Sequence, residues 1–238
     1  MAAPIALGAL AERLRVGQHE MISIVGGGGK TTTMYALGSQ VAGTAVLTTT
    51  TKMGHDQTGG RPVLLSPDDY ELDGALAAHR SVVAWQRIDA QKAVGVDPAT
   101  CNHWFDHADH VIIEADGSRR KPFKAPRALE PVIPSQTTLL LACIGADALG
   151  RVIADQCHRP LRIAAIAGCS PYERLTPARA AAVLRSERGS RKDQPAQARF
   201  AVVITKVDDE ASALAAELTE ILGSDTECVS VRMRPPTG

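Results

Sequence analysis

Residues 21–32 read MISIVGGGGKTT, an apolar run of strand length that ends in four glycines, a lysine and two threonines. Residues 31–41 then follow a helical pattern. Because glycines lack a Cβ atom, the backbone can curl tightly and direct its N–H groups at an anion, beside the positive end of the helix. The stretch therefore predicts a strand–loop–helix unit that binds phosphate.

The predicted nucleotide-binding residues of this unit have separate tasks. The backbone of Gly26, Gly27, Gly28 and Gly29 would cradle phosphate oxygens, and Lys30 would neutralise the β and γ phosphates. Thr31 would offer its hydroxyl to Mg²⁺, and Thr32 would add a phosphate contact. These residues indicate an Mg-nucleotide, GTP or ATP, as the ligand.

The motif differs from two common nucleotide-binding patterns. Ile24 occupies the first glycine position of G-x-x-x-x-G-K-[ST], so the sequence is closer to a G-G-x-G-K-[ST] variant. The dinucleotide fingerprint G-x-G-x-x-G does not fit, because Thr31 replaces its third glycine and no acid follows about 20 residues later. A flexible glycine turn is the alternative interpretation of the loop.

Helix-like and strand-like segments alternate along the chain, which predicts an α/β fold of three layers, with a mainly parallel sheet and helices on both faces. We expect residues 1–238 to form a single P-loop nucleotide-binding domain. The expected strands cover residues 21–25, 45–47, 63–65, 82–85, 111–113, 138–144, 201–204 and 228–231. The expected later helices cover residues 67–79, 177–188 and 208–222, and the polar residues 186–198 suggest a flexible loop.

Composition excludes several classes of partner. The 26 basic residues balance the 26 acidic ones and aromatic residues make up 3%, so neither nucleic acid nor an anionic membrane is expected to bind. No stretch approaches the roughly 20 apolar residues that span a bilayer, and residues 1–10 do not resemble a signal peptide, so we expect a cytoplasmic protein. Five scattered cysteines predict free thiols.

A second predicted element of the site is VIIEADG at residues 111–117. This apolar strand delivers Glu114 and Asp116 to its carboxyl end, where parallel sheets bind ligands. Residues two apart in a strand point the same way, so both carboxylates are candidates to hold magnesium or position water. Ordinary loop acids are the alternative.

Two further motifs follow predicted strands. Residues 205–208 read TKVD, which resembles the guanine-reading [NT]KxD motif, so Lys206 and Asp208 are candidate base contacts; a helix-capping Asp208 is the alternative. Residues 48–53 read TTTTKM, a hydroxyl-rich loop in which Thr50 is a candidate γ-phosphate sensor, or part of a surface turn.

The chain resembles the YqeC family, whose members are described as accessory proteins of selenium-dependent hydroxylases. The resemblance covers nearly the whole chain and rests on the following motifs: VGGGGKTTTM at 25–34, TTTTKM at 48–53, EADGSRRKPFKAP at 114–126, EPVIP at 130–134 and HRP at 158–160. It implies a P-loop NTPase-like fold and a role in maturing selenium-dependent molybdenum hydroxylases, with the client enzyme or its maturation proteins as partners.

Basic residues follow the strand-end acids and define a candidate substrate region. Lys121 and Lys124 are candidate catalytic cations, beside Lys30, Glu114 and Asp116. Arg119, Arg120, His158 and Arg159 are candidate substrate contacts. A solvated basic loop, a structural histidine and a helix-capping arginine are the respective alternatives.

Cys101, His103, His107 and His110 fall within ten residues, and His103 and His107 share a helix face. A transition-metal site is one interpretation, but no distant Cys–His pair completes the ligand set. We therefore expect the bound metal to be magnesium, together with the nucleotide.

The sequence supports three functional hypotheses. In the first, the protein is a slow regulatory NTPase that serves a client enzyme. In the second, it is a small-molecule kinase or nucleotidyl-transfer enzyme whose acceptor is anionic. In the third, it is a non-catalytic chaperone or scaffold gated by nucleotide.

Overall fold

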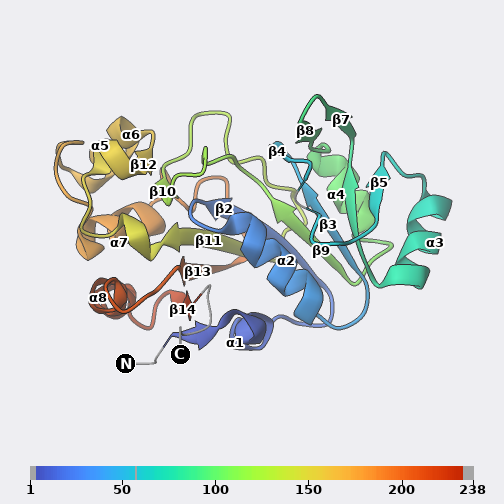
Figure 1. Cartoon of the computed structure of the whole chain (residues 1–238), viewed down its shortest axis with the longest axis horizontal. Coiled ribbons are helices and arrows are strands. Elements are labelled where there is room, and N and C mark those ends of the chain that lie inside the picture. Colours follow the sequence, from blue (N-terminus) through green and yellow to red (C-terminus); the bar gives the residue numbers. More distant parts are fainter. Residues whose placement is uncertain (1–3, 57, 233–238) are drawn as a thin grey trace.

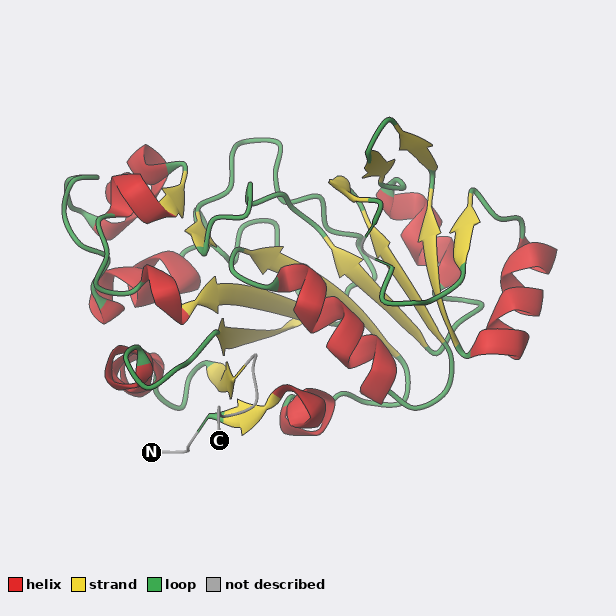
Figure 2. Cartoon of the chain, viewed as in Figure 1, coloured by secondary structure: helices red, strands yellow, loops and turns green. Residues whose placement is uncertain are grey.

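The computed structural model describes residues 4–56 and 58–232; residues 1–3, at the start of the segment considered for targeting, lie outside them. A nine-stranded sheet runs through the described chain, and every neighbouring pair of its strands is parallel (Figures 1 and 2). In sheet order the strands are β1 (Ile5–Ala6), β14 (Glu227–Arg232), β13 (Arg199–Thr205), β11 (Leu139–Gly145), β2 (Glu20–Gly26), β9 (His110–Glu114), β3 (Ala45–Thr49), β6 (Ser81–Trp85) and β5 (Val63–Leu65).

Helices connect these strands and lie on both faces of the sheet. The helices are α1 (Leu10–Arg13), α2 (Lys30–Gln40), α3 (Asp69–His79), α4 (Pro98–Trp104), α5 (Ile153–Gln156), α6 (Pro160–Ala167), α7 (Pro177–Arg185) and α8 (Ser212–Leu222). Two short 3₁₀ helices, η1 (Leu7–Ala9) and η2 (Ala146–Ala148), complete the set among the described residues.

Two hydrophobic clusters, one on each face of the sheet, make the fold three-layered. Alternate strand residues pack either with Met34 and Leu37 of α2 or with residues of α3, α4, α7 and α8. The central strands are buried on both faces, which explains their continuous apolar sequences. The predicted α/β architecture, with a parallel sheet between helices, is confirmed.

All the central strands end at one edge of the sheet. Neighbouring registers place Ile24 beside Glu114, and Cys143 beside Gly26, so β2, β9 and β11 reach this carboxyl edge together. The edge gathers the glycine-rich loop, the two acids and the TKVD segment, which had been separate motifs in the sequence.

Some helix boundaries differ from the sequence prediction. Pro67 does not open α3; instead Asp68 caps it, accepting from Glu71 N while the Glu71 side chain accepts from Asp68 N. Helix α7 begins at Pro177 as predicted but ends at Arg185, and α8 begins at Ser212 rather than residue 208.

Two small sheets lie outside the predicted strands. Strands β4 (Lys52–Gly54), β8 (Lys92–Val94) and β7 (Arg87–Asp89) form an antiparallel sheet. Strands β10 (Phe123–Lys124) and β12 (Cys157–His158) form a parallel pair of two residues each. The second pair matters for the site, because it brings residue 158 beside residue 124.

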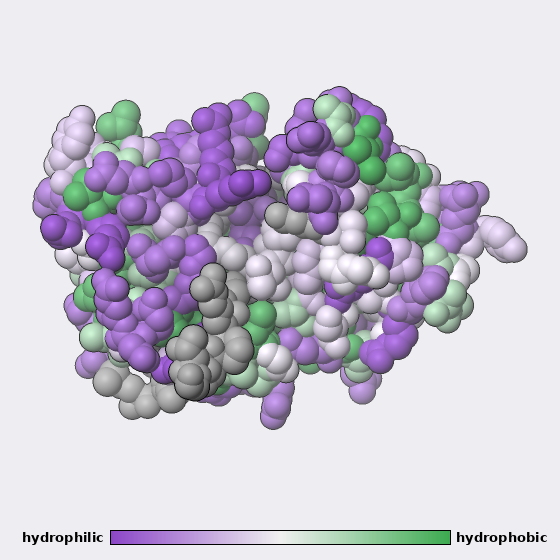
Figure 3. Space-filling view, in the orientation of Figure 1, coloured by the Kyte–Doolittle hydropathy of each residue, from purple (hydrophilic) through white to green (hydrophobic). Residues whose placement is uncertain are grey.

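The surface is largely polar in the view of Figure 3, with an apolar area near β5 and β7. Val63, Leu65 and Ile88 are exposed there. Residues 186–198 form turns, as expected for a loop, yet Ser190 is buried and its N–H donates to Val183 O. Among the described residues no helix combines the length and apolar composition needed to cross a membrane.

Candidate functional site

The glycine-rich loop, Gly26–Gly29, packs closely against the end of β11. Gly26 and Gly28 have φ angles of +94° and +74°, in the left-handed region that favours glycine. A Cβ atom would lie 2.3 Å from Cys143 O at Gly26, and 2.4 Å from Gly145 N at Gly28. The loop therefore requires glycine both for its conformation and for its contact with β11.

The N-terminus of α2 follows the loop directly. Gly29 occupies the N-cap position, and no side chain caps the helix. The first N–H groups of a helix have no partner inside it. Thr31 and Thr32 lie at this end, beside an open groove of about 490 Å³ that Tyr35 and Arg61 also line. The unpaired N–H groups at this end of a helix are suited to bind an anion.

Lys30 is buried at the centre of an ion network. Its Nζ donates to Gly26 O at 2.9 Å and lies 3.5 Å from Glu114 Oε1 and 3.4 Å from Asp116 Oδ1. Burial disfavours the charged ammonium, but the two carboxylates outweigh this cost and hold the pKa of Lys30 above its usual value. Lys30 is therefore a charged lysine that the protein itself neutralises.

Glu114 and Asp116 make different contacts around Lys30. Thr31 Oγ1 donates to Glu114 Oε2 at 2.6 Å, and Gly26 N donates to Asp116 Oδ2 at 3.1 Å. Asp116 Oδ1 is buried without a hydrogen-bond partner among the described residues, although Lys30 Nζ lies near it. The predicted set Lys30, Thr31, Glu114 and Asp116 thus meets at one point.

The network continues from Asp116 through Lys124 to Glu130. Lys124 is 1% exposed, and its Nζ lies 3.0 Å from Asp116 Oδ2 and 2.9 Å from Glu130 Oε2. Arg159 forms a two-pronged pair with Glu130, at 2.8 and 3.2 Å. Although burial opposes ionisation, Lys124 and Arg159 lower the pKa of Glu130. Acids and bases therefore alternate from Glu114 to Arg159.

His158 joins this region through the β10–β12 pair, in register with Lys124. Burial, together with the nearby Arg159, Lys124 and Arg119, lowers its pKa to about 4. The imidazole is therefore neutral near pH 7 and able to accept a proton or a hydrogen bond.

The side chains of Lys121 and Thr50 make structural contacts, and those of Arg119 and Arg120 are exposed. Lys121 Nζ donates to Asp155 O at 2.6 Å, so its side chain ties the loop after β9 to helix α5. Arg119 and Arg120 lie in an exposed turn with positive φ angles. Thr50 Oγ1 donates to Val132 O at 2.7 Å, so this hydroxyl ties the turn after β3 to the segment around Val132.

The TKVD segment lies directly beside the glycine-rich loop, because Thr205 Oγ1 donates to Gly28 O. Lys206 pairs with Asp147 at 2.8 Å, and Asp208 Oδ1 accepts from Ala211 N at 2.8 Å, so Asp208 caps the turn before α8. A cavity of about 250 Å³ lies between these acids and is lined by both Asp147 and Asp208.

Glu130 is the residue that sequence reasoning missed. It joins Lys124 to Arg159 and is 8% exposed. The sequence contained one signal of its role, because Glu130 is a charged residue in the otherwise apolar, proline-containing EPVIP motif.

These features define an α/β protein with a glycine-rich loop and a buried network of charges at the carboxyl edge of a parallel sheet. The family model described as "YqeC protein" matches residues 22–161. The chain is 31% identical over 208 residues to "Uncharacterized protein YqeC" of Escherichia coli (strain K12), covering 82% of this chain and 79% of that protein. The chain belongs to the YqeC family. No solved structure matches it.

Proposed function

We propose that the protein is a P-loop NTPase-like enzyme that binds an Mg-nucleotide at residues 26–32 and hydrolyses it. One observation carries the proposal: Lys30 and Thr31, which open α2 after the glycine-rich loop, both contact Glu114 on the adjacent strand. A lysine for phosphate charge, a hydroxyl for a metal and strand-end carboxylates are the groups that phosphoryl chemistry requires.

In the proposed mechanism Lys30 exchanges partners. In the structure, Glu114 and Asp116 neutralise it at 3.4–3.5 Å. A bound triphosphate would accept Lys30 and the N–H groups at the start of α2, which no side chain caps. The exchange replaces one buried ion pair with another. Since Lys30 is already buried in the folded protein, binding would not have to remove it from water again.

The oxygen atoms around Lys30 fit magnesium, a cation that prefers such ligands. Thr31 Oγ1, Glu114 and the orphaned Asp116 Oδ1 would hold Mg²⁺, which would supply charge neutralisation at the phosphates. Glu114 or Asp116 would also orient a water molecule for attack. Catalysis in this arrangement is mainly electrostatic, through Lys30 at the β and γ phosphates.

The base of the nucleotide would occupy the cavity beside the TKVD segment. Asp208 accepts from Ala211 N through Oδ1, and the hydrogen bond from Thr205 Oγ1 to Gly28 O holds the segment against the glycine-rich loop. A carboxylate oxygen next to a cavity of about 250 Å³ suits the two N–H donors of guanine. GTP is therefore the nucleotide we favour over ATP.

Family membership suggests the setting of this activity, an accessory role in the maturation of selenium-dependent molybdenum hydroxylases, with Mg-nucleotide turnover linked to a client. The contacts of Lys124 and Arg159 favour hydrolysis over transfer to an anionic acceptor. Both residues pair with Glu130, which already neutralises part of their positive charge.

The test is calorimetric binding of non-hydrolysable GTP and ATP analogues with Mg²⁺, followed by phosphate release from GTP and ATP. Lys30→Ala should abolish binding, and Thr31→Val should weaken it specifically when Mg²⁺ is present. Lys92→Ala is the control, because Lys92 is an exposed lysine of β8 outside the predicted nucleotide-binding motifs. Absence of binding to the wild-type protein would overturn the proposal; binding without phosphate release would favour a nucleotide-gated scaffold.

A further inference from the structure

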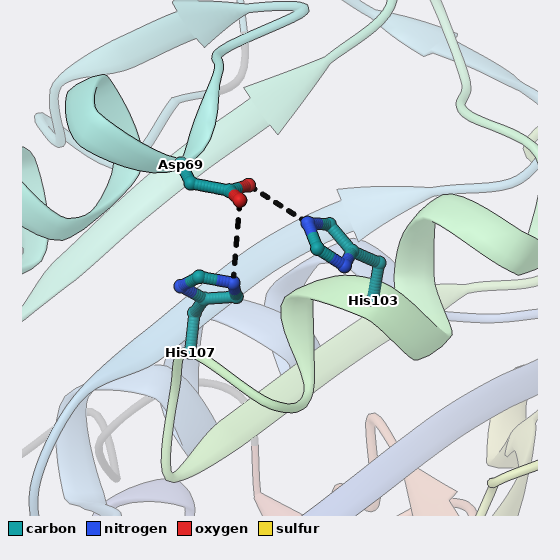
Figure 4. A group of neighbouring side chains, drawn as sticks. All are labelled: Asp69, His103 and His107. Atoms are coloured by element: carbon teal, nitrogen blue, oxygen red, sulfur yellow. Dashed lines mark hydrogen bonds and ion pairs between the residues drawn. The ribbon is translucent and has the colours of Figure 1, made fainter.

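A cluster of potential metal ligands lies away from the nucleotide site, between α3 and α4 (Figure 4). Asp69 is the first residue of α3, His103 belongs to α4, and His107 lies in the turn that follows α4. Asp69 Oδ1 lies 2.7 Å from His103 Nε2, and Asp69 Oδ2 lies 3.8 Å from His107 Nε2. One carboxylate thus faces two imidazole nitrogens.

A second carboxylate sets the orientation of one imidazole. His107 Nδ1 lies 2.9 Å from Asp73 Oδ1, one helical turn after Asp69 on α3. If Nδ1 carries the proton and donates it to Asp73, Nε2 keeps its lone pair and faces Asp69. This carboxylate–histidine arrangement is the usual outer support of a metal-binding histidine.

We propose that Asp69, His103 and His107 form a binding site for a divalent transition metal of the zinc class. One ligand atom from each residue lies within 4.8 Å of the others. Bonds of about 2.0–2.1 Å in a tetrahedral site separate ligand atoms by roughly 3.3 Å, so small side-chain rotations suffice. Asp69 and His103 are about half exposed, which leaves a fourth position for water.

The ligand chemistry separates this site from the proposed magnesium site. Two imidazole nitrogens with a carboxylate suit Zn²⁺, Co²⁺ or Ni²⁺, whereas Glu114, Asp116 and Thr31 offer only oxygen. The metal site also differs from the group considered in the sequence. Cys101 is buried in the hydrophobic core and His110 is buried in β9, so neither is available at this surface.

A metal here would act as a cross-link. It would tie the start of α3 to the turn that leads from α4 into β9, the strand that carries Glu114. Since the metal binds the folded arrangement, it should raise the melting temperature in a concentration-dependent way.

The test is titration of tag-free, chelator-treated protein with Zn²⁺ by calorimetry and with Co²⁺ by visible absorption. We expect one saturable Zn²⁺ site and the intense Co²⁺ bands of a low-coordinate site. His103→Ala and His107→Ala should each remove both signals, and Asp73→Asn should weaken Zn²⁺ binding by about 10- to 100-fold. His79→Ala, an exposed histidine on the same helix α3, is the matched control and should bind as the wild type does.

The proposal is wrong if the wild-type protein binds no Zn²⁺ up to millimolar concentration, or if the His103 and His107 variants bind it unchanged. GTP binding measured on the same variants separates this result from the nucleotide proposal. The two sites use different residues, so loss of the metal site should leave nucleotide affinity intact.

Discussion

Removing the Lys30 ammonium should destabilise the ligand-free protein strongly, apart from any effect on nucleotide binding. Lys30 Nζ lies 3.5 Å from Glu114 and 3.4 Å from Asp116. At an effective dielectric constant of about 20, each attraction is worth roughly 5 kcal/mol before desolvation is subtracted. Removing one partner of a buried pair leaves an uncompensated charge, and the net loss is about 3–5 kcal/mol.

Urea unfolding of Lys30→Ala measures this loss as a change in the free energy of unfolding. The double variant Lys30→Ala/Glu114→Gln should recover part of the loss, because it removes the carboxylate that is left without a cation, whereas Asp116 keeps Lys124. Lys52→Ala should change the free energy of unfolding by less than about 1 kcal/mol. A Lys30→Ala protein as stable as the wild type, or no recovery in the double variant, would refute the idea that Lys30 compensates buried carboxylates.

Three other substitutions, with Gly117→Ala as a control, test neighbouring parts of the site. Gly28→Ala should lower the free energy of unfolding by about 1–3 kcal/mol, because the new Cβ would clash with Gly145 N and the φ angle of +74° is strained for alanine. Gly117→Ala has open space around it and should be close to neutral in the same urea assay. Asp208→Asn should reduce affinity for a GTP analogue by about 10- to 100-fold and leave that for an ATP analogue unchanged; equal losses in calorimetry would remove the guanine assignment. NMR titration should give His158 a pKa of about 4. As the pH falls, this imidazole is protonated in the unfolded chain before it is protonated in the folded protein, so the free energy of unfolding should fall between pH ~6.5 and 4. The fall should be smaller in His158→Gln.

Local sequence predicted the parts of the fold where one pattern dominates. Strand β2, the glycine-rich loop and α2 follow the prediction to within a residue or two, because the apolar run and the glycines leave few alternatives. Proline gave a wrong start for α3, since the Asp68–Glu71 capping box fixes that boundary instead. Strands β10 and β12, of two residues each, depend on contacts 34 residues apart and have no periodic signal.

The site was predictable where it follows strand ends. Glu114 and Asp116 could be placed beside Lys30 because parallel strands share a carboxyl edge. The same reasoning could not tell which lysines of the basic segment belong to the site. Lys121 and Lys124 are three residues apart and chemically alike, yet one binds a surface carbonyl while the other is buried between two acids. Tertiary packing decides between them, and the sequence contains no sign of it.

Under the proposed function, the alternating charges from Glu114 to Arg159 would couple the binding of nucleotide to that of Mg²⁺. A triphosphate that takes Lys30 from its carboxylates leaves Glu114 without its cation, and Asp116 retains only Lys124. A divalent cation held by Thr31 and Glu114 would restore the balance that Lys30 provided. Each proposed ligand would then remove a cost that the other faces. Because such coupling is reciprocal, nucleotide should raise the affinity for Mg²⁺ by the same factor as Mg²⁺ raises the affinity for nucleotide.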